Sequence, residues 1–302
     1  MKLVLSAVLV FSAILSSQSA FGADVRQART ARGQPLGAIM IEGKIEKGDF
    51  EKFTNFFIDN PRINSSVYLY SPGGDFTEAL KIGRLIHTLK LTTWAPQSIE
   101  RTMPLNELSD QSNRVCASSC FFIFAAGAQR FGEIVGIHRP YLPPDAYKNL
   151  SMAEAGQAHM AVAGILEEYL KEIDVPLSYV DRIIAVDSGE IEWLSEEEIK
   201  KHFNDFAPAY REWIAAVCSP PPETDKQRML RILEATPVQY KKLPVSEVPY
   251  SPLDREFLDR YFAQEDNYYS CRHSAQEKEV DRLWKIMYQR RSGRLENAQR
   301  SN

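Results

Sequence analysis

Apolar and polar positions change their spacing several times between residues 36 and 207. Short continuous apolar runs, most of them followed by glycine or proline, predict buried strands at residues 37–43, 66–70, 91–94 and 134–137. Between them, apolar residues recur every three or four positions or form a longer dense run, which predicts helices at residues 49–58, 77–89 and 115–128. Strands that alternate with helices indicate an α/β domain with a largely covered sheet.

Two further segments belong to this region. Residues 153–173 give the longest helical pattern, and its expected inward side contains Met160, Ile165, Leu166, Tyr169, Leu170 and Ile173. Residues 96–114 are polar and lack a clear period, which predicts a long surface loop. Such a loop is either a lid over a nearby cleft or a tolerated insertion.

The last part of the chain has a different character. Residues 218–222 open a proline-rich linker, and further prolines are expected to keep the next segment extended: Pro237, Pro244, Pro249 and Pro252. Residues 274–289 predict an amphipathic helix whose Trp284 packs onto the main domain, and the chain should fray after it. Its mixed charges predict a solvated face, with attraction to anionic lipid headgroups as the alternative. We expect residues 208–302 to form a smaller, mainly helical extension.

The first segment has the pattern of a secretory signal. Lys2 precedes an apolar stretch at residues 3–15, and small polar residues follow. Ala20 and Gly22 satisfy the small-residue requirement at −3 and −1, which predicts cleavage after Gly22. A retained membrane anchor is the alternative, but the apolar stretch is shorter than the ~20 residues of a span and lacks a basic flank. We expect a periplasmic or secreted protein.

Composition restricts the class of protein. The 302 residues are 44% hydrophobic and 25% charged, which excludes a disordered chain, a collagen and a coiled coil as the main fold. A net charge of −4 gives no general attraction to nucleic acid, so no nucleic-acid partner is expected. No other apolar run is long enough to cross a bilayer, and a soluble mature protein is expected.

The cysteines are informative because export implies an oxidising compartment. Four cysteines allow three pairings. Cys218 and Cys271 flank the C-terminal region and are expected to staple it. Cys116 and Cys120 lie on either side of Ser118: a disulfide would brace this turn, whereas a free thiol could compete as a nucleophile. The spacings do not suit zinc, and no metal site is expected.

Three local signals carry candidate chemistry. The turn at residues 71–74 (SPGG) joins a strand to a helix and can direct a backbone N–H outward, although many such turns only reverse the chain. Ser118 begins an apolar helix among small residues, where a serine is often a cap. His138 ends a strand, where a histidine can be structural or a general base. Together they supply a nucleophile, a base and an oxyanion hole.

These segments resemble the Clp protease proteolytic subunit family of the ClpP/crotonase superfamily, from about residue 38 to residue 195. Residues 67–74 (VYLYSPGG) are similar to the family's strand-plus-SPGG segment. Ala117-Ser118 followed by residues 126–128 (AGA) resembles its AAS…AGA segment, with the same nine-residue step from the serine to the glycine. Residues 137–140 (IHRP) resemble its IHQP. With the leader and the CASSC version, the chain most resembles predicted periplasmic ClpP-like proteins of bacteria.

The resemblance implies a fold and roles. The fold would be a spiral of repeated ββα units. Ser118 would be the nucleophile, His138 the general base, and the backbone N–H groups of Gly74 and Ser119 the oxyanion hole. The helix at residues 153–173 resembles the family's handle helix, which mediates ring assembly, so a homo-oligomer through this helix is a hypothesis.

The third member of the triad is open. The family places its aspartate shortly before a segment that resembles residues 193–195 (WLS). Counting forward reaches Asp187, whereas counting back reaches Ile191, which cannot orient an imidazole. A short insertion reconciles the counts and favours Asp187. The alternatives are Glu190, Glu192 or a serine–histidine dyad.

The predicted function is that of an exported serine peptidase, with its catalytic domain at residues 23–207 after a signal at residues 1–22. It would hydrolyse peptides or unfolded proteins through an acyl-enzyme, without a cofactor. No Clp ATPase partner is expected because periplasms lack ATP, so activity would be ATP-independent. The main alternative is an inactive binding or scaffold protein of the same fold. Crotonase-like acyl-CoA chemistry is disfavoured by export and by the serine–histidine pair.

Overall fold

The structure is a computed structural model that describes residues 22–30, 32–61, 66–97, 108–141, 148 and 150–300, with the backbone alone for 294–300. The apolar stretch of the predicted signal and most of the predicted loop at residues 96–114 lie outside the described residues.

The described residues form a main sheet of six strands in the order β1-β2-β3-β4-β6-β9. The strands are β1 (Asp24–Arg29), β2 (Pro35–Glu42), β3 (Ser66–Tyr70), β4 (Thr92–Trp94), β6 (Gln129–Phe131) and β9 (Asp205–Phe206). The four inner strands run parallel, and β1 and β9 are antiparallel to their neighbours. The inner strands are rich in buried apolar residues, as parallel strands covered on both faces require.

A second sheet of three short strands adjoins the first. It pairs β5 (Cys116–Ala117) with β7 (Val135–Ile137) in parallel, and β7 with β8 (Glu192–Trp193) antiparallel. Ser71, one residue beyond β3, forms a bridge to Cys116 and so connects the two sheets. The turn at residues 71–74 therefore begins where the sheets meet.

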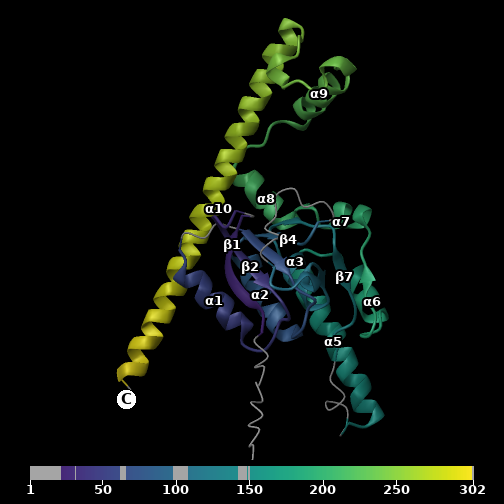
Figure 1. The fold of residues 1–302 in the computed structure, drawn as a ribbon, viewed down its shortest axis with the longest axis vertical. Coiled ribbons are helices and arrows are strands. Elements are labelled where there is room, and N and C mark those ends of the chain that lie inside the picture. The colour runs from purple at the N-terminus through teal and green to yellow at the C-terminus, as the bar shows by residue number, and fades with distance from the viewer. Residues whose placement is uncertain are drawn as a thin grey trace, which may run out of the picture.

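Helices cover the sheets and extend beyond them (Figure 1). They are α1 (Asp49–Asp59), α2 (Phe76–Thr88), α3 (Ser119–Ala125), α5 (Met152–Glu172), α6 (Ser178–Ala185), α7 (Glu196–His202), α8 (Pro208–Val217), α9 (Glu223–Glu234) and α10 (Pro252–Arg300). Short 3-10 helices occur at Gln111–Asn113, Val238–Tyr240 and Val245–Glu247. All of α3 is buried and lies in the main hydrophobic core. The protein is mixed α/β, as the alternating pattern predicted, and both of the sheets described combine parallel and antiparallel pairs.

The prediction of one helix over residues 115–128 is wrong at both ends. Cys116 and Ala117 form strand β5, Ser118 is a sharp turn, and α3 ends at Ala125 before β6 begins. The segment is mostly apolar because all of it except Val115 and Ser118 is buried. Such a run has no periodicity that distinguishes a strand from a helix.

The expected inward side of α5 is correct only in part. Leu166, Tyr169 and Leu170 are buried, but Met160 is 75% exposed and Ile165 is 43% exposed. The reason is visible in Figure 1, where the first half of α5 projects past the body of the protein.

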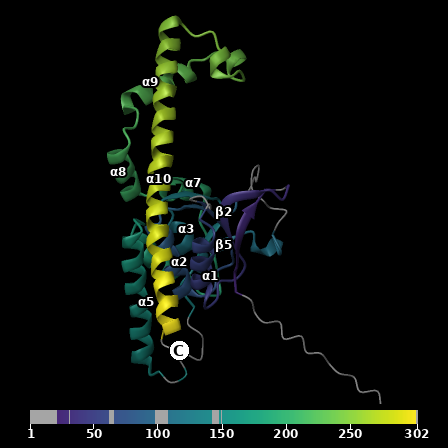
Figure 2. The same cartoon turned by 90° about the vertical axis from the view of Figure 1, so that its left-hand side faces the viewer.

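The C-terminal part is more helical than predicted. Residues 223–234 form α9 instead of an extended segment, and α10 is one helix of 49 residues that continues to Arg300 instead of fraying after residue 289. Two of the prolines mark helix starts, since Pro222 is the N-cap of α9 and Pro252 is the first residue of α10. Figure 2 shows α10 running along the body.

The predicted packing of Trp284 is confirmed. Its indole N–H donates a 3.0 Å hydrogen bond to the carbonyl oxygen of Ile58 at the end of α1, and its ring packs against the main core. A disulfide between Cys218 and Cys271 ties the segment after α8 to α10, as expected. The long helix is therefore fastened to the body by a disulfide and by packing of its second half.

Candidate active site

Ser118 forms a strained elbow between a strand and a helix. Its φ of 57° and ψ of −127° lie outside the regions that L-residues favour, and such a conformation costs about 1–3 kcal/mol. It follows β5 directly and precedes α3 directly. Hydrolase nucleophiles on strand-to-helix turns of this kind have their hydroxyl held out from the sheet. Ser118 is half-buried, whereas its neighbours Ala117 and Ser119 are buried.

A disulfide spans this elbow. Cys116 and Cys120 are bonded to each other, with their Cα atoms 5.2 Å apart. The bond connects the strand to the first turn of α3 across Ser118. Of the two states expected for these cysteines, the structure has the bonded one, and neither thiol is available as a competing nucleophile.

The SPGG turn packs directly against the serine. A Cβ atom added to Gly73 would lie 2.5 Å from Cβ of Ser118 and 2.9 Å from its Oγ. Gly73 also has a φ of 100°, which side chains rarely adopt. Only glycine therefore fits at this position while Ser118 holds its elbow.

The next residue along the turn, Gly74, lies between two backbone hydrogen bonds to Ile45. The Ile45 amide donates to the carbonyl of Gly73 (2.8 Å), and the carbonyl of Ile45 accepts from the Asp75 amide (2.7 Å). The Gly74 amide between them has no acceptor among the residues that the structure describes, and neither does the amide of Ser119 at the start of α3. Two unpaired N–H groups near a serine can stabilise an oxyanion.

His138 follows the strand that pairs with the serine's strand. The Ser118 amide donates a 3.0 Å hydrogen bond to the carbonyl of Gly136, and β7 ends one residue before His138. Nδ1 of His138 lies 2.7 Å from the carbonyl oxygen of Arg139. Because a carbonyl only accepts, Nδ1 is the donor, and Nε2 keeps its lone pair for a proton.

The Asp187 carboxylate contacts the residue after the histidine. Its Oδ2 accepts a 2.9 Å hydrogen bond from Arg139, whose own amide donates to the carbonyl of Val186. A hydrogen bond from the Gly189 amide and the charge of Arg139 lower the pKa of Asp187, so it is ionised at neutral pH. Within the described ranges, no hydrogen bond joins this carboxylate to His138, and none joins the Ser118 hydroxyl to the imidazole.

The two alternative carboxylates have other surroundings. Glu190 is exposed, in the turn that follows Asp187. Glu192 lies opposite Ile137 in β8 and forms an ion pair with Arg182. Continuing this antiparallel register by one residue places Ile191, an apolar residue, opposite His138.

A cleft of about 670 Å³ opens beside the elbow. Ser118 and Gly74 both line it, so the predicted nucleophile and one predicted oxyanion donor share one cavity. The other lining residues come from the 44–47 loop, the start of α2, the segment after His138, and α5: Lys44, Ile45, Glu46, Lys47, Asp75, Phe76, Thr77, Pro140, Tyr141 and Val162.

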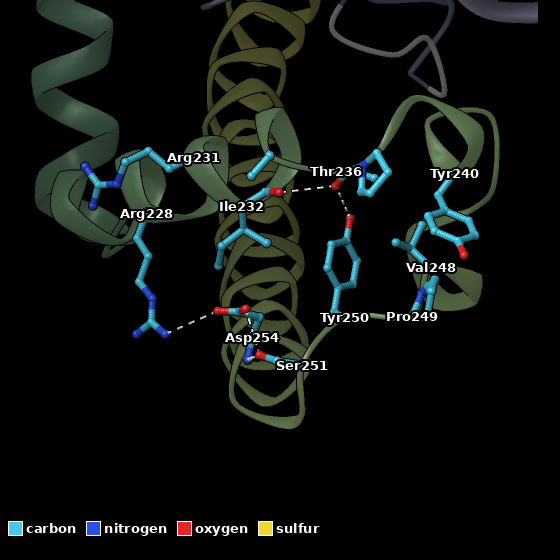
Figure 3. Close-up of a pocket in the computed structure, with 12 residues that line it drawn as sticks. Arg228, Arg231, Ile232, Thr236, Tyr240, Val248, Pro249, Tyr250, Ser251 and Asp254 are labelled. Carbon is cyan, nitrogen blue, oxygen red and sulfur yellow. Dashed lines mark hydrogen bonds and ion pairs between the residues drawn. The ribbon is translucent and has the colours of Figure 1, made fainter.

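A second cavity, of about 380 Å³, lies in the C-terminal extension between α9 and the start of α10 (Figure 3). Its wall is fixed by Thr236, whose hydroxyl contacts the carbonyl of Ile232 and the Tyr250 hydroxyl, and by an ion pair between Arg228 and Asp254. It contains none of the predicted catalytic residues.

No group of histidine, cysteine and acidic side chains in the described part of the chain could hold a metal ion. None of the described helices combines the length and the apolar character needed to cross a membrane. The two disulfides favour an oxidising compartment, such as the periplasm or the cell exterior.

In comparisons with known proteins, no family model and no curated protein matches this chain.

Two features of the site were not visible in the sequence. Ile45 supports the SPGG turn through backbone hydrogen bonds, which leave no trace in side-chain patterns. The Arg139 carbonyl holds the imidazole, and only its place beside His138 in the IHRP segment could have drawn attention to it.

Proposed function

We propose that this protein is an exported serine peptidase that cleaves peptides or unfolded chains through an acyl-enzyme. The observation that carries the proposal is the Ser118 elbow, strained and in contact with Gly73, beside an unpaired Gly74 amide. Backbone strain of this kind is kept where the surrounding structure gains from it, and it clusters at active sites. A serine used only as a helix cap would have no need of it.

The mechanism follows from the donors and acceptors present. Nε2 of His138 takes the proton from the Ser118 hydroxyl while Oγ attacks the substrate carbonyl. The negative charge that forms on the carbonyl oxygen is held by the amides of Gly74 and Ser119. The imidazolium then returns the proton to the leaving amine, and a water molecule deprotonated by His138 hydrolyses the ester on Ser118.

The imidazole is oriented without a carboxylate in this proposal. The Arg139 carbonyl sets the tautomer by accepting from Nδ1, and Asp187 holds the Arg139 side chain. Asp187 is then a positioning residue that acts through Arg139. This assigns the catalysis to a serine–histidine dyad and predicts a slower enzyme than a full triad, because a carbonyl stabilises an imidazolium less than a carboxylate does.

We further propose that the domain is a ClpP/crotonase-like spiral. The order of the SPGG turn, the Ser118 segment and the IHRP segment supports this, as does their position around the junction of the two sheets. A homo-oligomer through α5 is part of the same proposal. Met152 and Met160 on its projecting half are 93% and 75% exposed, an unusual degree of exposure for methionine. A monomer mass by light scattering would overturn the oligomer.

A test of the activity uses a quenched fluorescent peptide library and unfolded casein, without ATP. Wild-type protein is expected to cleave substrate, and Ser118→Ala is expected to lose cleavage while keeping its circular dichroism spectrum. Ser178→Ala, which changes an exposed serine on α6, is the matched control and should cleave like wild type. Equal cleavage by wild type and Ser118→Ala would contradict the proposal.

A second candidate is a non-catalytic binding or scaffold protein. The absence of a carboxylate hydrogen-bonded to His138 among the described residues favours it. In a deletion strain with a measurable phenotype, rescue by Ser118→Ala equal to that by wild type would support this candidate. Failure of rescue with normal protein levels would support the peptidase.

A further inference from the structure

The start of β1 is tied to a buried carboxylate. Ala23 is 2% exposed, and its backbone nitrogen donates a 2.8 Å hydrogen bond to Oδ2 of Asp49. Asp49 is the first residue of α1 and is fully buried. The same oxygen accepts from the Glu46 amide (2.7 Å), and Oδ1 forms an ion pair with Lys52 (2.8 Å).

The residue before Ala23 has very little space. A Cβ atom added to Gly22 would lie 2.5 Å from Oδ1 and 2.8 Å from Oδ2 of Asp49. The peptide bond between Gly22 and Ala23 therefore lies directly against the Asp49 carboxylate. The sequence predicts cleavage at this same bond.

We propose that cleavage of the Gly22–Ala23 bond creates an α-ammonium group on Ala23 that forms a buried ion pair with Asp49. The hydrolysis consumes one water molecule, leaves a carboxylate on the released Gly22, and gives Ala23 a free amine that is protonated at neutral pH. A buried carboxylate gains more from a cation than from a neutral amide, because the low local dielectric strengthens the attraction. Processing would therefore strengthen a contact that the uncleaved chain makes only as a neutral hydrogen bond.

The contact between Ala23 and Asp49 is connected to the candidate active site through Glu46 and Ile45. Glu46, whose amide shares Oδ2 with Ala23, lines the Ser118 cleft. The preceding residue, Ile45, holds the backbone of Gly73 and Asp75 on either side of the Gly74 amide. The new N-terminus would thus fasten the loop that supports the proposed oxyanion hole, although the ion pair itself does not depend on catalysis.

Among the described residues, Lys52 is the ionic partner of Asp49, and its side chain is half-exposed. Charged groups on the neighbouring loop, on α2 and on β1 form other pairs: Lys44 with Glu46, Lys81 with Glu78, and Arg26 with Asp24 and Glu42. Lys47 on the same loop is exposed. Carboxyl, lysine and arginine side chains do not ordinarily titrate between about pH 7 and pH 9, whereas an α-amine does. The Ala23 amine is therefore the group whose titration this contact would report.

The test compares two mature chains, released from a cleavable fusion, that differ by one glycine: one begins at Ala23 and the other at Gly22. The added glycine makes the Ala23 nitrogen a neutral amide again and places the ammonium group one residue earlier, on Gly22. At about pH 6.5 the Ala23 chain is expected to melt about 5 °C higher, in line with a buried ion pair. Asp49 should raise the pKa of the amine above its usual value of about 7.7–8.0, so the advantage is present below that range and is lost as pH rises through the raised pKa.

Two further measurements make the outcome specific. Asp49→Asn should abolish the difference between the two chains. If that variant does not fold, acetylation of the Ala23 amine in the wild-type chain should lower its melting temperature to that of the Gly22 chain. Equal melting temperatures of the two wild-type chains, or no effect of acetylation, would overturn the proposal. The same comparison in Ser118→Ala should give the same result, which separates this inference from the peptidase activity.

Discussion

The backbone amide of Ser118 donates a 3.0 Å hydrogen bond to the carbonyl oxygen of Gly136. This bond extends the pairing of β5 with β7 by one residue and fixes where the elbow begins. It also fixes the register between the serine's strand and the strand that leads to His138, which lies two residues beyond Gly136. The catalytic proposal depends on this register, since a slip of one residue would turn the side chain of one strand to the other face.

Gly73→Ala should damage the site through backbone conformation and overlap. The new Cβ would lie 2.5 Å from Cβ of Ser118 at a φ of 100°, so we expect a loss of about 3 kcal/mol in unfolding free energy. Cleavage by the folded protein should fall at least about 100-fold, because the adjacent Gly74 amide would be displaced. Urea unfolding and peptide cleavage measure the two effects.

Gly293→Ala is the matched control for that substitution. Gly293 lies on α10, and a Cβ there would have no atom within 4 Å. The change should stabilise the protein by about 0.5–1 kcal/mol and leave cleavage unchanged. If Gly73→Ala has the same effects as Gly293→Ala, the close contact between the SPGG turn and Ser118 is wrong.

The two disulfides should have separable effects. Cys218 and Cys271 are 53 residues apart, so replacing both with alanine is expected to cost about 4 kcal/mol of stability, whereas the four-residue separation of Cys116 and Cys120 predicts about 2 kcal/mol. Activity should follow the opposite order: the folded Cys116→Ala/Cys120→Ala protein should lose at least about tenfold in cleavage rate, since only this bond spans the elbow. A larger loss of cleavage rate in the Cys218→Ala/Cys271→Ala protein than in the Cys116→Ala/Cys120→Ala protein would contradict this prediction.

Asp187→Asn distinguishes a dyad from a triad. Because Asp187 holds Arg139 and not the imidazole, kcat/KM should fall less than about tenfold, whereas His138→Ala should lose about 100-fold to 10,000-fold. Glu190→Gln, an exposed carboxylate in the same turn, is the control and should have no effect. A loss in Asp187→Asn as large as that in His138→Ala would mean that this carboxylate acts directly on the histidine.

The lowered pKa of Glu42 predicts that part of the stability of the fold is lost in acid. Burial raises the pKa of Glu42, but hydrogen bonds from Arg26, Ser109 and the Asp110 amide outweigh this effect, so the pKa lies below its ordinary value. Its contribution to stability is therefore present above the unfolded pKa of about 4.3 and is lost as pH falls through the lower folded pKa. In urea unfolding between about pH 6 and pH 3, Glu42→Gln should depend less on pH than wild type. Glu196→Gln, an exposed glutamate, should keep the wild-type pH dependence.

Elements with a clear period were predictable. Phe53 and Phe57 lie on the buried face of α1, and the apolar spacing of residues 49–58 predicted that helix to within one residue. The strand at residues 66–70 was predicted in full because it is short, apolar and closed by a proline-glycine turn. In both cases the local pattern and the tertiary environment agree.

Other elements depend on partners that a local pattern does not contain. Strand β1 has the sequence DVRQAR, which gives no strong strand signal and is stabilised by pairing with β2. Helix α9 and the first half of α10 were missed because the prolines were expected to keep this segment extended, although proline is favoured in the first turn of a helix.

The residues of the candidate site were easier to predict than its geometry. The SPGG, Ser118 and His138 segments stood out as motifs, and the structure places Ser118 against the SPGG turn. The elbow conformation of Ser118 and the support from Ile45 depend on long-range backbone contacts, which follow from a strand register that a single sequence does not specify. The ion pair of Asp187 with Arg139 joins side chains 48 residues apart, and no local pattern indicates it.

The most direct test of the catalytic proposal is mass spectrometry of the folded protein after treatment with a fluorophosphonate. With both disulfides intact, we expect one adduct per chain, located on Ser118 by peptide mapping, much slower to form in His138→Ala and absent in Ser118→Ala. No adduct on the folded wild-type protein, or an adduct on any other residue, would contradict catalysis by Ser118.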